Sequence, residues 1–277
     1  MKPASASRPG FPLRMPERDN QQTAIKNVAS SALVTVATGL KQPQKTASQP
    51  VFRPDTKATS SGLGLDSSPV RARMVQKLAA QGLQDSRVLA AMGLVERHRF
   101  VDSALSNQAY EDTSLPIGLG QTISKPNVVA RMLELLLKGH VGKLGRVLEI
   151  GTGCGYQAAV LAQLAIEVYS IERLRGLHDK ARVNLRPLRV ANLHLLFGDG
   201  MLGYARGAPY AAIIAAAGGE AIPTAWTDQL AVGGRLVAPV QGQGGTQALV
   251  VADKTARGIT QTLLEAVHFV PLKSGIG

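Results

Sequence analysis

Residues 147–156 read VLEIGTGCGY, which is a short apolar run, a glycine-rich turn and the beginning of a helical segment. Glycines let the backbone turn sharply and pass close to a ligand, and the start of a helix offers free N–H donors. A dinucleotide-binding turn has the spacing G-x-G-x-x-G, whereas this turn is G-x-G-x-G with Tyr156 at the sixth position. The spacing favours a nucleoside cofactor without a pyrophosphate, and a tight turn without a ligand is the alternative. The candidate cofactor-binding residues of the turn are Gly151, Thr152, Gly153, Cys154 and Gly155.

Short apolar runs alternate with helical segments from about residue 145 onward, which is typical of a doubly wound parallel sheet. This order predicts an α/β fold with a mostly parallel sheet. Helices are expected at residues 156–164, 175–185 and 224–230. Strands are expected at residues 146–150, 167–171, 193–197, 210–215, 235–240, 248–252 and 266–270.

Two acidic residues follow the next expected strands. Glu172 ends the second strand, where a carboxylate borders the cofactor crevice and can accept hydrogen bonds from both ribose hydroxyls. The alternative is a surface glutamate beside Arg173. Asp199 and Gly200 follow the third strand, and Asp199 is a candidate acceptor for the exocyclic amine of adenine, although a plain turn would have the same sequence.

The chain upstream of the sheet divides into two parts. Residues 1–65 contain seven prolines, nine basic and three acidic side chains, a composition that predicts a disordered basic extension with a short helix around residues 23–36. Half of the formal net charge of +12 lies in this extension. Residues 66–120 have a helical pattern, and Asp85 is expected to cap a helix there. The folded domain is therefore expected to consist of this helical region and an α/β core at 121–277, and to span residues 66–277.

Composition narrows the functional classes. The single cysteine, Cys154, excludes an intrachain disulfide framework and a cysteine-based zinc cluster, and it fits a reducing compartment. No apolar run is long enough for a membrane helix, and no secretory signal begins the sequence. The five histidines are too scattered for metal-ligand spacing. We therefore expect a cytoplasmic protein without a metal or membrane partner.

Several motifs together identify a family. The runs YED at 110–112, LPIGLGQTIS at 115–124 and FVPL at 269–272, with the glycine turn, YSIE at 169–172 and GDG at 198–200, resemble the protein-L-isoaspartate(D-aspartate) O-methyltransferases. The GQTIS segment is the specific part. The resemblance covers nearly all of residues 70–272, and it implies a Rossmann-like methyltransferase fold with S-adenosylmethionine as cofactor.

The resemblance also implies a reaction and a substrate site. The expected activity transfers a methyl group to the free carboxylate of L-isoaspartyl and D-aspartyl residues in damaged proteins and starts repair through a succinimide. The hydroxyl that matches Ser124 lies at the substrate pocket of the family and is its essential side chain, so Ser124 is the candidate catalytic residue. The candidate substrate-binding residues are Thr122, Ile123, Ser124 and Lys125. From the residues alone, Ser124 could merely cap the following helix, and Lys125 could be either a solvated lysine or a weak attractor of the substrate carboxylate.

Four residues depart from the family pattern: Glu96 replaces a proline, Cys154 a serine, Ala211 an aspartate and Trp226 an aliphatic residue. Two other classes of function stay open. One is a methyltransferase for another carboxylate, or a nucleotide-dependent oxidoreductase. The other is a catalytically silent fold that binds nucleic acid through the extension and the basic helix at 175–185; that helix has no interleaved aromatic residues, so no obligate nucleic acid partner is expected. The expected partners are isoaspartyl proteins and peptides, and the protein is expected to be a monomer.

Overall fold

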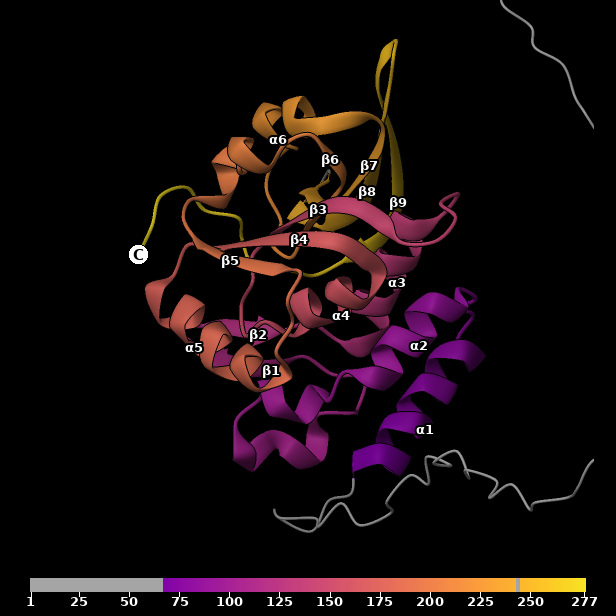
Figure 1. The fold of residues 1–277 in the computed structure, drawn as a ribbon, viewed down its shortest axis with the longest axis vertical. Coiled ribbons are helices and arrows are strands. Elements are labelled where there is room, and N and C mark those ends of the chain that lie inside the picture. The colour runs from indigo at the N-terminus through magenta and orange to yellow at the C-terminus, as the bar shows by residue number, and fades with distance from the viewer. Residues whose placement is uncertain (1–66, 243–244) are drawn as a thin grey trace, which may run out of the picture. The chain divides into compact units, whose positions relative to one another are not determined.

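The computed structural model describes residues 67–242 and 245–277, and a seven-stranded sheet forms its centre (Figure 1). The strands lie in the order β5-β4-β3-β6-β7-β8-β9. Neighbouring strands from β5 to β7 pair in parallel, and β8 and β9 add an antiparallel edge. The mostly parallel α/β sheet is therefore confirmed. Its strands are β3 (Leu144–Ile150), β4 (Ala165–Glu172), β5 (Leu193–Phe197), β6 (Tyr210–Ala215), β7 (Leu230–Gln241), β8 (Gln247–Thr255) and β9 (Gly258–Val267).

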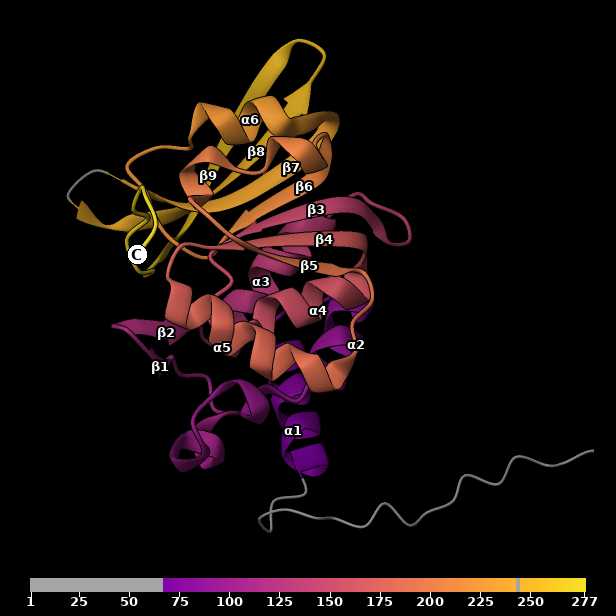
Figure 2. The same cartoon turned by 60° about the vertical axis from the view of Figure 1, so that its left-hand side comes forward.

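Each face of the sheet buries its own apolar cluster, because successive strand side chains point to opposite faces. Val147 belongs to one cluster and Leu148 to the other. The helices α4 (Tyr156–Leu164) and α5 (Arg175–Leu185) lie together on the first face, and α6 (Thr224–Gln229) lies on the second (Figures 1 and 2). The sheet thus forms the middle of three layers.

The N-terminal part of the described chain is helical, as expected. It consists of α1 (Ser67–Ala80), α2 (Ser86–Leu94) and the short 3-10 helices η1 (Arg97–Phe100) and η2 (Ser103–Gln108). Asp85 is the predicted cap of α2, since its carboxylate accepts hydrogen bonds from the backbone of Arg87 and Val88. None of the helices in the described ranges is long and apolar enough to cross a membrane.

A small hairpin connects these helices to the sheet domain. Its strands, β1 (Leu115–Gly118) and β2 (Gln121–Ile123), pair antiparallel, and Gly118, Leu119 and Gly120 at the tip all have positive φ. The hairpin is attached to α5, because Lys180 Nζ donates to the Ile117 carbonyl at 2.9 Å. Figures 1 and 2 both show β1 and β2 beside α5. The hairpin therefore places Ser124, which directly follows β2, close to the seven-stranded sheet and its helices.

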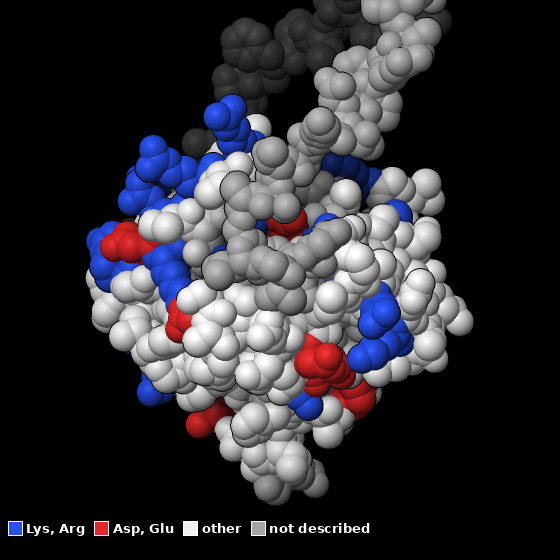
Figure 3. Space-filling model, turned by 90° about the horizontal axis from the view of Figure 1, so that it is seen from below, with Lys and Arg blue, Asp and Glu red and all other residues white. Residues whose placement is uncertain are grey.

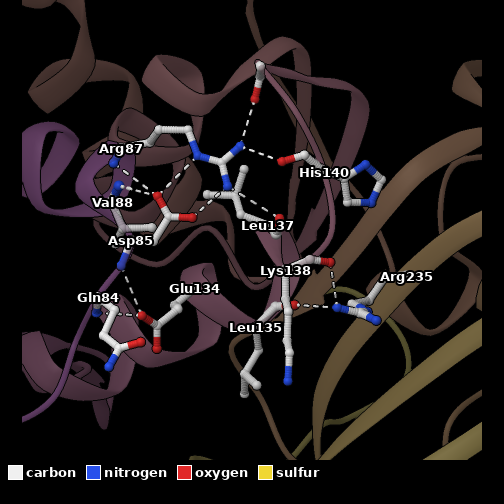
Figure 4. Close-up of polar contacts among 11 residues, drawn as sticks. Gln84, Asp85, Arg87, Val88, Glu134, Leu135, Leu137, Lys138, His140 and Arg235 are labelled. Atoms are coloured by element: carbon white, nitrogen blue, oxygen red, sulfur yellow. Dashed lines mark hydrogen bonds and ion pairs between the residues drawn. The ribbon is translucent and has the colours of Figure 1, made fainter.

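The helix α3 (Pro126–Leu137) follows the hairpin, and two arginines fix its C-terminal end (Figure 4). Arg235 on β7 donates to the carbonyls of Leu135 and Lys138 at 3.0 and 2.8 Å. Arg87 on α2 donates to the Leu137 carbonyl at 3.3 Å and to the Asp85 carboxylate. Helix ends leave carbonyls unpaired, so these contacts join α2, α3 and β7 into one rigid frame.

The sequence predictions were wrong at two places. The last strand, expected at 266–270, is β9 at Gly258–Val267; most of its side chains are exposed, so it lacks the hydrophobic alternation that marks a strand. Residues 66–120 end in β1 rather than in a helix. The prediction missed this strand because four residues that include Pro116 are too few to show the alternation of apolar and polar side chains that marks a strand. The predictions for residues 1–65, including the helix at 23–36, lie outside the described residues.

Candidate functional site

A cavity of about 490 Å³ lies at the carboxyl ends of β3 and β4. Its lining brings together three sequence motifs that are far apart in the chain: the end of the β1–β2 hairpin, the glycine turn after β3 and the end of β4. The volume falls within the range of small-molecule sites. The predicted site residues that line it are Thr122, Ile123, Ser124, Gly151, Thr152, Gly153, Cys154, Glu172 and Gly200. Gly155, Asp199 and Lys125 are not among the lining residues.

The glycine turn requires its glycines for two physical reasons. Gly151, Gly153 and Gly155 have φ values of 90°, 56° and 92°, a region that other residues rarely adopt. A Cβ on Gly155 would also lie 2.8 Å from Leu185 Cδ1. Gly155 therefore supports the turn by close packing against α5 and does not face the cavity.

The carboxylate of Glu172 is fixed by backbone amides on both sides. Its Oε2 accepts from Gly153 N at 2.8 Å and its Oε1 accepts from Leu174 N at 2.9 Å. The side chain is buried yet lines the cavity. Each carboxylate oxygen has a second lone pair, so Glu172 can still accept hydrogen bonds from a ligand.

Asp199 and Gly200 lie at the end of β5 in different roles. Asp199 Oδ1 accepts from Met201 N at 2.8 Å and Oδ2 accepts from Gly275 N at 2.6 Å. Gly200 lines the cavity, and a Cβ there would lie 2.6 Å from Ile150 Cγ2. The buried Trp226 donates from Nε1 to the Gly200 carbonyl at 2.8 Å. Trp226, a departure from the family pattern, thus supports the cavity residue Gly200. The two residues are 26 positions apart, and the sequence gives no sign that they are in contact.

A buried polar chain lies behind the glycine turn. Thr152 Oγ1 and Ser170 Oγ are 2.6 Å apart, and Ser170 also contacts the Glu149 carboxyl group. Burial raises the pKa of Glu149 to about 8, and the nearby negative charge of Glu172 adds to this. Glu149 is therefore protonated at neutral pH and can share hydrogen bonds in a site where a charge would be costly.

Cys154 is buried in the cavity wall. Burial raises the pKa of its thiol to about 11, so the reactive thiolate form is not populated at neutral pH. Across residues 67–242 and 245–277, no cluster of three or more His, Cys, Asp or Glu side chains could hold a metal ion.

Ser124 lies between β2 and α3 and lines the same cavity as the glycine turn. Helix α3 begins at Pro126, and Lys125 at its cap position makes no side-chain cap hydrogen bond. Within the described part of the chain the Ser124 hydroxyl has no hydrogen-bond partner, whereas its carbonyl accepts from Arg97 Nη2 at 2.7 Å. The helix-cap interpretation of Ser124 therefore has no support, and its hydroxyl is available to a ligand. Lys125 is exposed beside it.

Arg97 is a site-related residue that the sequence analysis missed. Its side chain is fully buried, and its guanidinium carbon lies 4.8 Å from the centroid of the Tyr156 ring at the start of α4. Arg97 therefore touches both the Ser124 segment and the helix that follows the glycine turn. The sequence around Arg97 does not show that its side chain is buried, because Arg97 belongs to a basic run and arginine is usually exposed.

Comparisons with known proteins agree with this site. A family model described as protein-L-isoaspartate(D-aspartate) O-methyltransferase matches residues 70–277. The protein-L-isoaspartate O-methyltransferase of Methylibium petroleiphilum is 57% identical over 270 residues, which are 96% of each chain. That of Leptothrix cholodnii is 61% identical over 237 residues, which are 84% of each chain.

Solved structures share the fold. A protein-L-isoaspartate O-methyltransferase structure aligns with a TM-score of 0.67 at 27% identity, covering 75% of this chain and 67% of that chain. A Plasmodium falciparum protein of the same name, in complex with S-adenosyl-L-homocysteine, aligns with a TM-score of 0.65 at 24% identity, covering 73% of this chain and 98% of that chain. The second likeness shows the fold alone.

Proposed function

Because the chain belongs to the protein-L-isoaspartate(D-aspartate) O-methyltransferase family, we propose that its cavity is the site of methyl transfer to damaged aspartyl residues. The chain is an S-adenosylmethionine-dependent methyltransferase that methylates the free carboxylate of isoaspartyl residues in proteins. The methyl ester then loses methanol as the neighbouring backbone nitrogen closes a succinimide, which starts repair. The observation that carries the proposal is that the GQTIS segment and the glycine turn line one and the same cavity.

The cavity residues fit S-adenosylmethionine. Gly151 and Gly153 line the cavity with positive φ values that let the backbone pass close to a ligand, and Glu172 presents a fixed carboxylate at the end of β4. We propose that Gly151, Thr152, Gly153 and Cys154 hold the methionine side of the cofactor. Glu172 accepts from the ribose hydroxyls, and Gly200 borders the adenine, with Asp199 fixing the turn that carries Gly200.

The substrate side needs little acid–base chemistry. A carboxyl group has a reference pKa of about 4, so the substrate is already an ionised nucleophile at neutral pH. When bound, S-adenosylmethionine supplies a methyl group already activated on a sulfonium. Ser124 donates a hydrogen bond to the substrate carboxylate and fixes its approach, with Thr122 and Ile123 shaping the wall and Lys125 at the rim. Orientation and exclusion of water are then the main sources of rate.

The direct test offers one peptide in two isomeric forms, L-isoaspartyl and L-aspartyl, with S-adenosylmethionine labelled on the methyl group. We expect base-labile label to enter the isoaspartyl peptide at least about a hundred times faster, because only that isomer presents its α-carboxylate on a side branch. Equal labelling of both peptides would support a methyltransferase for another carboxylate. Labelling of neither, with strong salt-sensitive RNA binding, would support the silent nucleic-acid-binding alternative.

We further propose a cytoplasmic monomer whose catalytic domain is residues 66–277, with residues 1–65 outside the catalytic machinery. The single cysteine supports the compartment, since it is buried and has no other cysteine to pair with. Basic side chains gather on one side of the face shown in Figure 3, where α5 lies. Arg182, Arg186 and Arg189 line a shallow groove there, but no Phe, Tyr or Trp side chain lines it for base stacking. This supports a protein for which nucleic acid is not an obligate partner.

A further inference from the structure

Arg97 is a buried cation that contacts the substrate wall of the cavity, the wall formed by Thr122, Ile123 and Ser124. Its side chain is 0% exposed, and no carboxylate in residues 67–242 and 245–277 forms an ion pair with it. Nε donates to the Ala109 carbonyl at 2.8 Å and Nη2 to the Ser124 carbonyl at 2.7 Å. The third nitrogen, Nη1, has no hydrogen-bond acceptor among these residues.

Such a group is costly to the fold. Taking a charge out of water costs several kcal/mol unless a partner of opposite charge compensates. Burial accordingly lowers the pKa of Arg97, and the opposing contributions, from Tyr156 first, then Cys154 and last the Asp112 carboxylate, are each smaller than this effect. Arginine starts from so high a pKa that it stays charged. The free protein thus contains a positive charge that lacks a direct counter-ion.

The position of Arg97 indicates that an anion bound in the cavity would act as its counter-ion. The Ser124 carbonyl accepts from the guanidinium, and Ser124 itself lines the cavity, so the cation contacts a cavity residue directly. Arg97 also packs on the ring of Tyr156, which follows the glycine turn. The low dielectric of this wall strengthens its attraction for a carboxylate.

We propose that Arg97 is the positioning residue and counter-charge of the substrate carboxylate subsite. This inference rests on the proposed function, because the anion is the isoaspartyl carboxylate. Arg97 holds the Ser124 segment in place and attracts the charged substrate through it. The product is a neutral methyl ester, so the same residue favours binding of substrate over product and assists product release.

A wild-type experiment separates Arg97 from the solvent-accessible cations near the cavity, which are Lys125, Arg173 and Lys273. It compares inhibition constants of an isoaspartyl peptide and the same peptide with an α-carboxamide, at about 50 mM and about 500 mM salt. Salt screens surface charges and leaves buried ones largely unaffected. We expect the preference for the carboxylate to change by less than about twofold. A preference that disappears at high salt would assign the attraction to these solvent-accessible cations and overturn the proposal.

Variants then test the residue itself. Arg97→Gln removes the charge and should raise the KM for the isoaspartyl peptide about tenfold, the scale of losing one interaction with a charged group, while the S-adenosylmethionine Kd stays within about twofold. Arg97→Lys keeps the charge and should recover part of that loss. The control Arg99→Gln, on the same short helix but paired with Glu96 at the surface, should leave both constants unchanged.

Two results would contradict the Arg97 assignment. One is a parallel rise of peptide KM and S-adenosylmethionine Kd in folded Arg97→Gln, which would make the residue merely structural. The other is equal behaviour of the Gln and Lys variants. If Arg97→Gln does not fold, the wild-type salt comparison decides. Failure of the proposed function itself would show as absent methyl transfer by the wild-type protein, which differs from all these outcomes.

Discussion

The cofactor wall of the cavity comes mainly from one βαβ unit, β3–α4–β4, with Gly200 added after β5. The substrate wall joins the β1–β2 hairpin and the start of α3, and Arg97 on η1 supports it from behind. In the cofactor wall, backbone amides and a carboxylate one strand away form the contacts, as between Gly153 and Glu172. In the substrate wall, Arg97 and Ser124 meet across 27 positions of sequence. The cofactor wall is therefore specified locally, and the substrate wall depends on tertiary packing.

The largest expected effect tests the cofactor wall. Glu172→Gln should weaken S-adenosylmethionine binding about a hundredfold, because it removes the charge from an acceptor that serves Gly153 N, Leu174 N and the ribose. Titration calorimetry with S-adenosylmethionine measures the loss. The peptide KM at saturating cofactor should change little; a comparable rise in that KM would show that the two walls are not separable.

A second prediction concerns the buried carboxyl group behind the cofactor wall. The pKa of Glu149 is about 8 in the folded protein, against an ordinary value near 4.5. The folded state therefore binds the proton more tightly than the unfolded state, and its stability falls as pH rises from about 4.5 through about 8. Glu149→Gln is neutral throughout and should gain in Tm relative to wild type as pH increases across this window.

The matched control is Glu167→Gln on the same strand, β4. Hydrogen bonds, first from Tyr169 and then from Arg146, lower the pKa of Glu167, so its charged form favours the fold and its removal should bring no gain at high pH. Thermal unfolding of the three proteins at about pH 5 and about pH 9 makes the comparison. A constant Tm difference between wild type and Glu149→Gln would show that Glu149 is ionised in the folded state.

The smallest expected effect sharpens the substrate wall. Lys125→Gln should raise the peptide KM by about twofold at low salt, because an exposed charge contributes about 0.5 kcal/mol. The effect should disappear at high salt. Steady-state kinetics at two salt concentrations measures it. An unchanged KM at low salt would make Lys125 a solvated residue with no part in substrate attraction.

The two walls also differ in how far sequence predicted them. The glycine turn, Glu172 and the bounds of α4 and α5 could be read directly, because the strand–turn–helix signal is contiguous. The resemblance made Ser124 a candidate site residue, but local sequence could not separate a catalytic hydroxyl from a helix cap. Arg97 and Trp226 were missed as site residues because their partners, Ser124 and Gly200, are distant in sequence and only the packed fold brings them together.

The most direct test of these separate roles is binding of S-adenosylhomocysteine, the product left after methyl transfer, to two variants. Ser124→Ala should bind it with a Kd within about twofold of wild type and lose at least about tenfold in kcat/KM for the isoaspartyl peptide. Glu172→Gln should lose most of that binding. If Ser124→Ala weakens S-adenosylhomocysteine binding as much as Glu172→Gln does, the assignment of separate cofactor and substrate walls is contradicted.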